Sequence, residues 1–593
     1  MMSNTSVHFK NKFEQAYQQL NARQQEAVNT IEGPVMVIAG PGTGKTQILA
    51  CRIGKILKET DTAPQHILCL TYTEAGAIAM RKRLQQFIGP AAYQVNIGTF
   101  HSFCNQVIQD NLYLFDKHTL DPVSDLERTA LLKQLIDAFP KNHPLKRYRG
   151  DVYFEAGNLQ RLFSDMKREG WSSSYLIECI DRYLQDLPLR KDYIYQRKYK
   201  TFQAGDVKQD KINEEIEKMQ KLRAAIFAFD DFNLLMQQHN RYDFDDMINW
   251  VIRVFETKPE ILAKYHEQFL YILIDEYQDT SGTQNKIADL LTNYWEQPNL
   301  FIVGDDDQSI YRFQGANIEN MLTQQRRFGN DLHKIVLTEN YRSSPAILAT
   351  AAAVIDNNTE RLINQVEGLT KNLKASGLNA HIQEQPTIIC YHSENEEMAG
   401  LVYATEALLD SGISHGSIGI IYKENKYGDV LADCFRKKNI AVYMRRDINL
   451  LDEIFIQQII QLIQYVASEL FIPYSGDEIL FRLLHAKWFD IPPAAIAAET
   501  ALSAAKKYSQ ATASLRSSLS EKASKPPQHL FDTGLHPQLK KASEIIEQLI
   551  ADAVNMSLQK FFESLIHSTG IIGYIWKHPE KMKLLKILDS FFD

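Results

Sequence analysis

The sequence predicts an α/β protein of several domains, in which parallel sheets are flanked by helices. Short apolar runs, each bounded by turn or polar residues, alternate with helical patterns, which is typical of a parallel sheet covered on both faces. The predicted strands are Val35–Ala39, Ile67–Leu70, Phe269–Ile274, Leu300–Val303 and Ile335–Leu337. A single core rarely grows beyond roughly 250–300 residues. A chain of 593 residues is therefore expected to form more than one domain.

Two helix-rich stretches interrupt this alternation. The first, Asn105–Arg241, carries many charges and indicates an inserted helical domain. The second contains predicted helices at Ile454–Leu470 and Ala542–Leu565. Between those helices, the Ser-, Ala- and Lys-rich segment Ala504–Pro527 is predicted to be a surface loop or linker.

The composition limits the expected partners and compartment. A formal net charge of -8 gives no global positive field, so nucleic acid would have to bind in a local groove. The six cysteines form no C-x-x-C pair, which argues against a zinc site, an iron–sulfur cluster or a disulfide framework. The first residues lack the apolar core of a signal peptide, and no apolar run of about 18 residues occurs. We therefore expect a soluble, cytoplasmic protein with no membrane contact.

The segment VMVIAGPGTGKT, which ends at Thr46, has the pattern of a phosphate-binding loop. An apolar strand leads into Gly40, Gly42 and Gly44, and a helix is predicted to follow. Glycines let backbone N–H groups approach phosphate oxygens, and the helix N-terminus adds partial positive charge. Lys45 can neutralise the β- and γ-phosphates, while the Thr46 hydroxyl can ligate Mg²⁺. The alternative is a tight glycine-rich turn with no ligand, and the motif alone does not separate motors from switches or kinases.

A pair of carboxylates follows another predicted strand. In FLYILIDEYQDT, Asp275 and Glu276 stand at the strand end, where the chain turns and both side chains can face a ligand. Asp275 could hold Mg²⁺, and Glu276 could polarise the attacking water, since water is a poor nucleophile without a base. The alternative is an ordinary exposed acidic pair, but a phosphate-binding loop earlier in the chain favours the functional interpretation.

Two further polar residues follow predicted strands. Gln308 comes after the strand that ends at Gly304 and could sense the γ-phosphate by hydrogen bonding. Arg342 comes after Ile335–Leu337, and its planar, permanent charge suits the transition-state charge on phosphate. Each signal is weak alone, because an arginine after a strand is usually a surface or salt-bridge residue.

Read in order, eight segments make a more specific pattern. They are LNARQQEAV (Leu20–Val28), AGPGTGKT (Ala39–Thr46), LTYTEAGAIAMRKRL (Leu70–Leu84), IGTFHSFC (Ile97–Cys104), DFDDMI (Asp243–Ile248), LIDEYQDT (Leu273–Thr280), VGDDDQSIYRFQGA (Val303–Ala316) and LTENYRSSPAIL (Leu337–Leu348). This ordered set resembles the motifs of superfamily 1 DNA helicases of the UvrD/Rep type, from the adenine-recognition motif through motif IV. A different class of phosphate-loop protein would share only two of them.

The resemblance implies an ATP and Mg²⁺ site with named roles. Gln24 would read the adenine edge, Tyr341 would stack on the adenine ring, and Arg342 would be an arginine finger from a second RecA-like domain. The loop that binds the nucleotide would comprise Ala39, Gly40, Pro41, Gly42, Thr43, Gly44, Lys45 and Thr46, with Ala39 in place of the usual first glycine. The catalytic set would be Lys45, Asp275, Glu276, Gln308 and Arg342, with Thr46 and Asp275 as the metal ligands.

The resemblance also implies a path for single-stranded DNA. Its lining would include Tyr72, Thr99, His101 and Phe313. Aromatic faces stack on bases whatever the sequence, and hydroxyl or imidazole groups hold phosphates. Core packing is the alternative for the two aromatic side chains.

Several positions depart from the family pattern. Gln47 and Gln314 stand where many members have an arginine, and Glu74–Ala75 stands where an Asn-Lys pair is frequent. ATP affinity and DNA contact at these points are therefore in question. Arg312 could supply the charge that is missing at Gln314.

The resemblance implies two RecA-like domains, each with a helical insertion. Domain 1A would comprise residues 1–104 and 241–330, 1B residues 105–240, the first part of 2A residues 331–451, and 2B residues 452–593. The two closing motifs of the second RecA-like domain are not found after residue 350. We therefore expect a fragment in which 2A and 2B are incomplete; the alternative is a homologue whose ending has diverged.

The expected function is ATP hydrolysis coupled to 3′-to-5′ movement on single-stranded DNA and to duplex unwinding, in DNA repair, recombination or replication. The expected partners are single-stranded and partly duplex DNA, together with repair or recombination proteins. Three alternatives stay open: a phosphate-loop ATPase with no nucleic-acid role, a truncated fragment that binds DNA and ATP without unwinding, and the helicase part of a helicase–nuclease.

Overall fold

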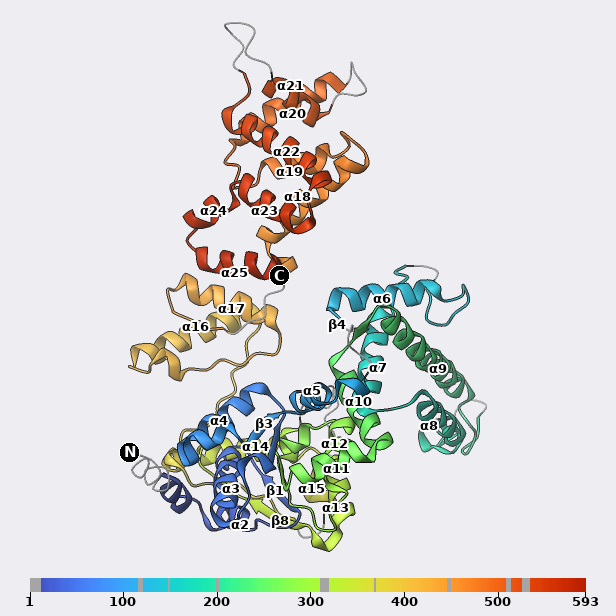
Figure 1. Cartoon of the computed structure of the whole chain (residues 1–593), viewed down its shortest axis with the longest axis vertical. Coiled ribbons are helices and arrows are strands. Elements are labelled where there is room, and N and C mark those ends of the chain that lie inside the picture. The colour runs from blue at the N-terminus through green and yellow to red at the C-terminus, as the bar shows by residue number, and fades with distance from the viewer. Residues whose placement is uncertain are drawn as a thin grey trace. The chain divides into compact units, whose positions relative to one another are not determined.

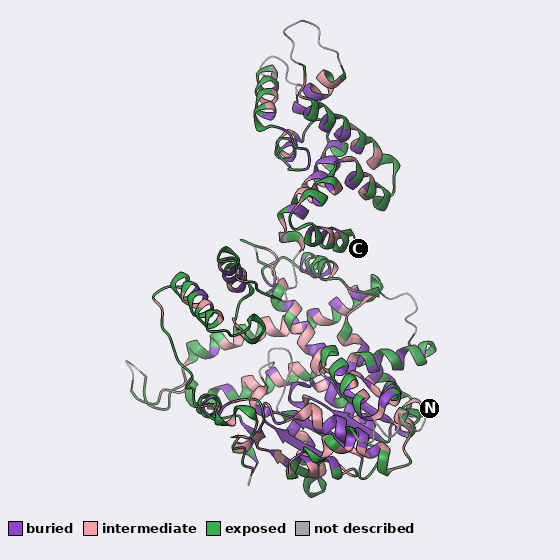
Figure 2. Ribbon diagram, turned by 90° about the vertical axis from the view of Figure 1, so that its left-hand side faces the viewer, coloured by how far each residue is buried: buried purple, intermediate pink, exposed green. Residues whose placement is uncertain are grey.

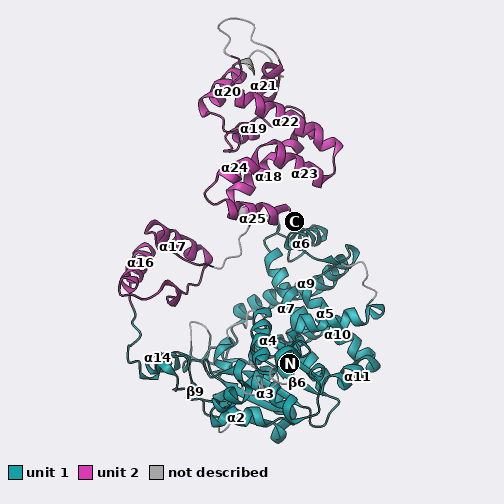
Figure 3. Cartoon of the chain, turned by 60° about the vertical axis from the view of Figure 1, so that its left-hand side comes forward, with its two compact units in different colours: residues 1–388 teal, residues 389–593 magenta. Residues whose placement is uncertain are grey.

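A six-stranded parallel sheet is the central element of residues 1–388, one of two units into which the chain divides (Figures 1 and 3). The computed structural model describes residues 12–115, 121–147, 150–198, 202–309, 319–366, 369–444, 450–507, 514–524 and 534–592. The strands are β1 (Val35–Ala39), β2 (Ile67–Thr71), β3 (Asn96–Thr99), β6 (Tyr271–Ile274), β7 (Leu300–Gly304) and β8 (His333–Leu337). Their order across the sheet is β3-β2-β6-β7-β1-β8. The predicted α/β fold is confirmed.

The sheet is buried on both faces because successive strand residues point to opposite sides. In β1, Val35, Val37 and Ala39 join one apolar core, and Met36 and Ile38 join the other. Figure 2 shows the resulting concentration of buried residues around the sheet. All five predicted strands are present. Strand β3 is not predicted from the sequence, since a four-residue strand that contains a glycine has no continuous apolar run.

Helices cover each face. Residues of α2 (Ala22–Asn29), α3 (Lys45–Glu59) and α4 (Glu74–Ile88) belong to the core of the first face. The second face packs against α5 (Phe100–Asp110), α10 (Phe244–Thr257), α11 (Pro259–Gln268), α12 (Gly282–Thr292) and α13 (Glu319–Phe328). The sheet is thus enclosed, and only its strand ends are open to a ligand.

The stretch between α5 and α10 is helical, as its sequence indicates. It contains α6 (Asp125–Ala138), α7 (Ala156–Glu169), α8 (Ser173–Asp186) and the 30-residue α9 (Gln209–Gln238), with the short strands β4 (Asp121–Pro122) and β5 (Arg241–Tyr242) at its two ends. Leucine and phenylalanine side chains of α6, α7 and α9 form a core separate from that of the sheet. This separate core is the physical reason for treating the stretch as an insertion.

Strand β8 differs from the expected domain division. Residues 331–451 are expected to belong to a second α/β domain, whereas β8 pairs in parallel with β1 over its whole length, from His333 opposite Val35 to Leu337 opposite Ala39. The elements that follow also lie in the first unit: β9 (Glu339–Asn340), α14 (Pro345–Ile355), α15 (Leu362–Gln365) and β10 (Lys374–Ala375). The buried side chains of β8 complete the first sheet, so β8 itself belongs to that sheet rather than to a second one.

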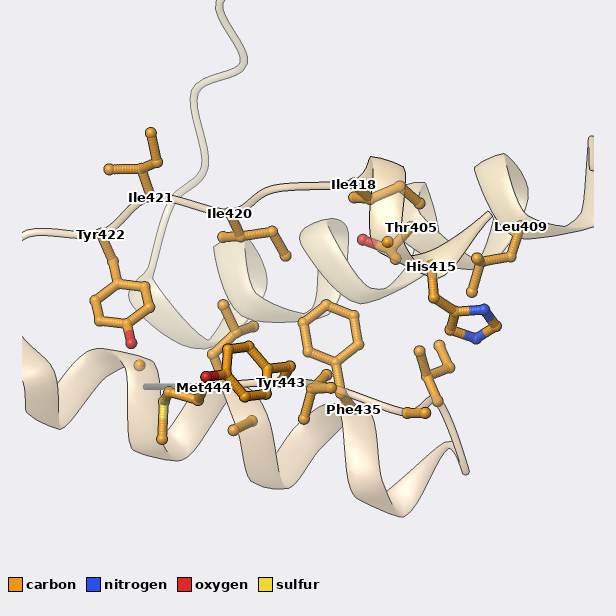
Figure 4. A pocket seen from close by; sticks show the side chains of 17 residues that line it. Thr405, Leu409, His415, Ile418, Ile420, Ile421, Tyr422, Phe435, Tyr443 and Met444 are labelled. Atoms are coloured by element: carbon orange, nitrogen blue, oxygen red, sulfur yellow. The ribbon is translucent and has the colours of Figure 1, made fainter. Parts of the chain in front are cut away.

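The unit of residues 389–593 begins with α16 (Glu394–Asp410) and α17 (Asn425–Lys437), which share a small apolar core. The apolar segments 418–422 and 440–444, which resemble strands in sequence, belong to no sheet among the described residues. They border a cavity of about 540 Å³ into which Phe435 of α17 points (Figure 4). The cavity contains none of the motif residues.

The remaining helices form one larger core. They are α18 (Ile454–Phe471), α19 (Asp477–Leu484), α20 (Pro493–Lys507), α21 (Leu515–Ser524), α22 (Pro537–Asn555), α23 (Leu558–Ser568), α24 (Ile571–Lys577) and α25 (Lys581–Phe592). The linker prediction is wrong for α21, since Leu515 and Leu519, one helical turn apart, are buried in this core. Among the described residues, α18 alone is long and apolar enough to cross a membrane, with a mean hydropathy of 1.2, yet one of its faces lies in the same core.

Arg52 offers a direct test of how the sheet unit is held together. This buried side chain of α3 donates hydrogen bonds to the carbonyls of Ala27, Thr30 and Ile31, and its guanidinium lies 4.2 Å from the centre of the Phe301 ring. It thereby fixes the end of α2 to the sheet. Arg52→Met leaves these carbonyls unsatisfied and should lower the unfolding free energy of this unit by about 2–4 kcal/mol.

Native-state hydrogen exchange of the β1 and β7 amides measures this loss. Arg23→Met, which removes an exposed arginine of α2, is the matched control and should change the value by less than about 0.5 kcal/mol. Equal exchange rates of these amides in Arg52→Met and Arg23→Met would contradict the stabilising role of Arg52.

Candidate functional site

The loop between β1 and α3 has the geometry that phosphate binding requires. Gly42 (φ 68°) and Gly44 (φ 89°) adopt the left-handed conformation that favours glycine, and Gly44 is the N-cap of α3. Thr43 closes the turn by donating its hydroxyl to the carbonyl of Gly40 at 2.7 Å. A side chain at Gly42 would meet Arg342 Cβ at 2.7 Å, so space as well as φ demands a glycine there. The loop presents its amides at the N-terminus of a 15-residue helix.

Lys45, the first residue of α3, lies against the strand-end carboxylates. Its Nζ forms an ion pair with Glu276 Oε2 at 2.6 Å, and its side chain is only 12% exposed. Glu276 has a φ of 48°, a left-handed backbone that is unusual for a residue with a side chain. This turn, directly after β6, brings the Glu276 carboxylate to the loop, while Asp275 Oδ1 accepts the Glu276 N–H at 2.9 Å. The structure thus brings Lys45, Asp275 and Glu276 together.

The electrostatics of this cluster are strained. Burial, reinforced by the negative charge of Glu276 and opposed by Lys45, raises the pKa of the Asp275 carboxyl to about 6. Burial and Glu276 also raise the pKa of Asp279 to about 6. Three carboxylates therefore compete for one lysine, and added positive charge would stabilise all of them.

The excess of carboxylates over positive charge bears on whether Mg²⁺ fits the site. Thr46 and Asp275 offer a hydroxyl and a carboxylate, the oxygen ligands that Mg²⁺ prefers. A divalent cation beside Asp275 would favour its ionised form, which burial alone disfavours. The donor set and the charge both fit the metal.

Gln308 follows β7 in the short 3₁₀ helix Asp306–Gln308. Its Nε2 donates to Asp305 Oδ2. Gln278 links this position to the carboxylate pair: its Oε1 accepts the Asp305 N–H at 2.8 Å, and its Nε2 donates to Glu276 Oε2 at 3.0 Å. Gln278 is not among the predicted site residues, although it lies within the segment LIDEYQDT.

The residues expected at the adenine lie beside the loop. Gln24 Nε2 donates to the carbonyl of Thr43 at 2.8 Å, and its backbone is fixed by a capping box with Asn21. The Tyr341 N–H donates to the carbonyl of Gly42 at 2.9 Å, and Asn21 Nδ2 donates to the Tyr341 hydroxyl at 2.9 Å. Gln24 and Tyr341, which lie in the first and the last of the eight motif segments, therefore both contact the phosphate-binding loop.

Arg342 lies in the same unit as the phosphate-binding loop, although the resemblance places it in a second RecA-like domain. Asn340 fixes it: Asn340 Oδ1 accepts the N–H groups of Arg342 and Ser343, and Asn340 Nδ2 donates to the carbonyl of Pro41 at 2.5 Å. Asn340 is not among the predicted site residues; its one signal in the sequence is its place directly before Tyr341 in TENYRSS.

At one departure from the family pattern, the structure supplies a nearby arginine. Gln47 stands where many relatives have an arginine, and Arg83 of α4 donates to Gln47 Oε1 at 2.8 Å. The corresponding departure at Gln314, and Arg312 beside it, lie outside the described residues.

Of the four residues expected to contact DNA, two occupy the ends of neighbouring strands. Tyr72 directly follows β2, and Thr99 ends β3, with Thr71 and Thr99 paired in register. Thr99 caps α5, and its hydroxyl donates to Glu74 Oε1 at 3.1 Å. His101 is the second residue of α5, and its Nε2 lies 3.8 Å from Asp245 Oδ1. Phe313 lies outside the described residues.

A glycine-rich loop at the edge of an enclosed parallel sheet, with lysine and carboxylates at its mouth, defines a phosphate-loop protein of the RecA-like fold. Residues 20–329 match the family model described as the UvrD/REP helicase N-terminal domain, and residues 335–496 match the UvrD-like helicase C-terminal domain. The chain belongs to the UvrD/Rep helicase family, as its motifs predict.

Curated relatives agree with this assignment. The chain is 27% identical over 482 residues to the ATP-dependent DNA helicase PcrA of Staphylococcus aureus (strain Mu50), a match that covers 80% of this chain and 57% of the relative. It is 28% identical, with the same coverage, to the PcrA of Staphylococcus epidermidis (strain ATCC 35984). The chain thus spans somewhat over half the length of these relatives.

The raised pKa of Asp275 predicts a conflict between stability and function. With a pKa near 6 in the folded protein against an ordinary 3.8, Asp275 opposes folding once it is ionised. Its cost is absent below about pH 4, grows between pH 4 and 6, and is complete above pH 6. In nucleotide-free protein at pH 8, Asp275→Asn should therefore raise the unfolding free energy by about 1–3 kcal/mol.

Urea unfolding at pH 8 and pH 4 measures this gain, which should disappear at the lower pH. Asp289→Asn, in which the carboxylate contacts Arg327 at 2.8 Å, is a control that should lose rather than gain stability. A loss of stability in Asp275→Asn at pH 8 would contradict the claim that the ionised Asp275 carboxylate opposes folding.

Proposed function

We propose that the chain is an ATP-dependent DNA helicase motor, which hydrolyses ATP to move 3′ to 5′ along single-stranded DNA and to open duplex DNA. The observation that carries the proposal is the ion pair between Lys45 of the loop and Glu276 at the end of β6. This ion pair places the ammonium that would bind phosphate beside the carboxylate that would act as the base for water. The polarity is supported by the resemblance of the motifs to those of UvrD/Rep helicases.

The residues act through an exchange of partners at Lys45. The β- and γ-phosphates of ATP would take the Lys45 ammonium from Glu276, since phosphate carries more charge than one carboxylate. Glu276 would then accept a proton from the attacking water, with Gln278 holding its Oε2. Mg²⁺, when bound, neutralises phosphate charge; Thr46 and Asp275 would hold it. Gln308 and Arg342 would contact the γ-phosphate as charge moves onto it.

The DNA path would run over the ends of β2 and β3. Tyr72 offers a stacking face there, and Thr99 and His101 offer polar groups for phosphates. Glu74 is unfavourable in this position, since its carboxylate accepts the Thr99 hydroxyl that a DNA phosphate would otherwise use. Both PcrA relatives are described as DNA helicases, which supports DNA as the track.

We also propose a domain division on the lines of 1A, 1B, 2A and 2B, with one change. The boundary between 1A and 2A should fall after β8 rather than at residue 331, because β8 completes the first sheet. The helices α18 to α25 would correspond to the 2B insertion.

Two variants test the hydrolytic site. Lys45→Ala should abolish nucleotide binding and hydrolysis, because no other group in the loop neutralises the phosphates. Glu276→Gln should keep nucleotide binding and lower the hydrolysis rate by about 10²–10⁴-fold, the usual worth of a general base. Binding of a fluorescent ATP analogue and steady-state ATPase assays give both quantities.

The control is Lys58→Ala, which removes an exposed lysine from the other end of α3. Hydrolysis at the parent rate in Glu276→Gln would reassign the base. Strand displacement on duplexes with 3′ or 5′ tails then tests the motor: opening of the 3′-tailed substrate supports the proposal, and ATP hydrolysis without opening favours a non-unwinding DNA and ATP-binding protein.

A second pair of variants tests the DNA path. Tyr72→Ala should weaken binding of single-stranded DNA by about 1–3 kcal/mol, the worth of a base–aromatic stack, with little change of sequence preference. Glu74→Gln should tighten it, by about 0.2–1 kcal/mol, because it removes a negative charge from the path. Fluorescence anisotropy with homopolymer oligonucleotides measures both.

Tyr93→Ala, at an exposed tyrosine, is the matched control. The tightening by Glu74→Gln should shrink as salt is raised, since exposed charges are screened. If affinity stays unchanged in Tyr72→Ala and Glu74→Gln alike, the track lies elsewhere.

A further inference from the structure

Residues 371–376 form a short segment, here called the strap, that contacts three of the motifs at once. Leu373 lies over the phosphate-binding loop, where a side chain at Gly40 would meet its Cδ2 at 2.6 Å. Strand β10 within the strap pairs in parallel with β9, the strand that leads into Tyr341 and Arg342. No motif identified in the sequence includes the strap.

Lys371 begins the strap with a buried charge. Its side chain is 1% exposed, and its Nζ contacts carboxylate oxygens of Asp305, Asp306 and Asp307. The contacts with Asp306 and Asp307 are 2.8 and 2.9 Å long. Burial alone would lower the pKa of Lys371, but the three carboxylates reverse this and raise it above its ordinary value. The lysine is therefore charged at neutral pH.

Side chains and backbone N–H groups of this chain contact all three aspartates. Arg361 donates to both carboxylate oxygens of Asp307, at 2.7 and 2.9 Å, and the Leu362 N–H donates to Asp306 Oδ2 at 2.8 Å. Such a cluster of carboxylates could in principle hold a cation. Here the Lys371 ammonium occupies the centre of the cluster, which makes the arrangement a protein ion-pair network rather than a metal site.

Asp305 is the member of the network that reaches the phosphate site. Its Oδ1 accepts from Lys371 Nζ and from the Asp307 N–H, and its Oδ2 accepts from Gln308 Nε2. Its own N–H donates to Gln278, the residue that also holds Glu276. Asp305 therefore stands between a fixed buried cation on one side and the expected γ-phosphate sensor on the other.

We propose that Lys371 is a positioning residue for ATP hydrolysis: its buried ammonium fixes the Asp305 carboxylate, which in turn orients the Gln308 amide toward the γ-phosphate. The strap thereby ties the sensor to the phosphate-binding loop through Leu373 and to the strand before Arg342 through β10. This inference rests on the proposed function, because it assigns a role within the same hydrolytic site.

A carboxylate that is 0% exposed, as Asp305 is, cannot rely on water to compensate its charge. Without Lys371 it would have to turn toward another donor or take up a proton. Either change alters the hydrogen bond that it accepts from Gln308. Nucleotide binding by the loop does not pass through this bond, so the effect should fall on the rate of hydrolysis rather than on affinity.

The test compares Lys371→Met, Asp305→Asn and the control Lys374→Met, which removes an exposed lysine three residues along the strap. In Lys371→Met and Asp305→Asn, kcat for ATP should fall by about 10–100-fold, the usual effect of losing a group that orients a reacting side chain, with KM within about threefold of the parent. Lys374→Met should retain the parent kcat. Asp305→Asn is included because Lys371→Met removes a buried charge and can unfold the protein, whereas Asp305→Asn keeps Lys371 paired with Asp306 and Asp307.

A double-mutant cycle identifies the route. In a Gln308→Ala background, Lys371→Met should lower kcat by no more than about twofold further, because its effect is already lost. If Lys371→Met lowered kcat by the same factor in the Gln308→Ala background as in the parent, Lys371 would act through another residue and the proposal would be overturned. Lys371→Arg, which keeps the charge, should recover part of the rate.

Amide hydrogen exchange of residues 305–309 gives a readout that does not need hydrolysis. Exchange should be faster in Lys371→Met than in Lys374→Met, since the Asp307 N–H loses its orienting acceptor. If the parent chain hydrolyses no ATP, the proposed function fails while exchange still decides whether Lys371 fixes this turn. Unchanged exchange in Lys371→Met, or unchanged kcat in an active parent, would overturn the inference.

Discussion

The ion pair between Lys45 and Glu276 is the interaction on which the rest of the site depends. It forms between the first residue of α3 and a residue with a left-handed backbone after β6, and it sits beside the buried Asp275. One ammonium faces several carboxylates whose charges burial disfavours. Such a site favours a ligand that brings a cation with it, because each added positive charge stabilises the ionised form of these buried carboxylates.

The parallel sheet explains why residues so far apart in sequence meet. The carboxyl ends of β1, β6, β7 and β8 share one edge, so the chain after each strand enters the same small region. Crowding there is severe: a side chain at Gly42 would meet Asn340 and Arg342, and one at Gly40 would meet Leu373. These close approaches let the Tyr341 backbone N–H and the Asn340 side-chain amide donate hydrogen bonds that fix the loop. The position of each motif is therefore set by its neighbours as much as by its own strand.

The sequence predicted the strands of the sheet and the residues at its edge because both leave local signals. A buried parallel strand reads as a continuous apolar run, and a phosphate loop needs glycines at fixed spacing. What it could not predict depends on tertiary contact. Strand β3 is too short and too polar to stand out, and the helix α21 forms because Leu515 and Leu519 find a core formed by distant helices.

The same limit applies to the candidate site. Gln278 and Asn340 lay within recognised motifs but showed no sign of their bridging roles, and Lys371 lay in a stretch with no motif at all. The role of Lys371 can be recognised only from its ion pair with Asp305, which lies 66 residues earlier in the chain. Membership of β8 in the first sheet was likewise invisible in sequence, since an apolar run does not state which sheet it joins.

The most direct test of this account is the position of Lys45 when nucleotide is bound. A crystal structure with Mg²⁺ and a non-hydrolysable ATP analogue would locate the Lys45 ammonium and the Glu276 carboxylate together. The account predicts that Lys45 Nζ lies about 2.7–3.2 Å from a phosphate oxygen, with the ion pair to Glu276 broken and Glu276 turned toward a water beside the γ-phosphate. A nucleotide bound in the loop while Lys45 stays paired with Glu276 would contradict it.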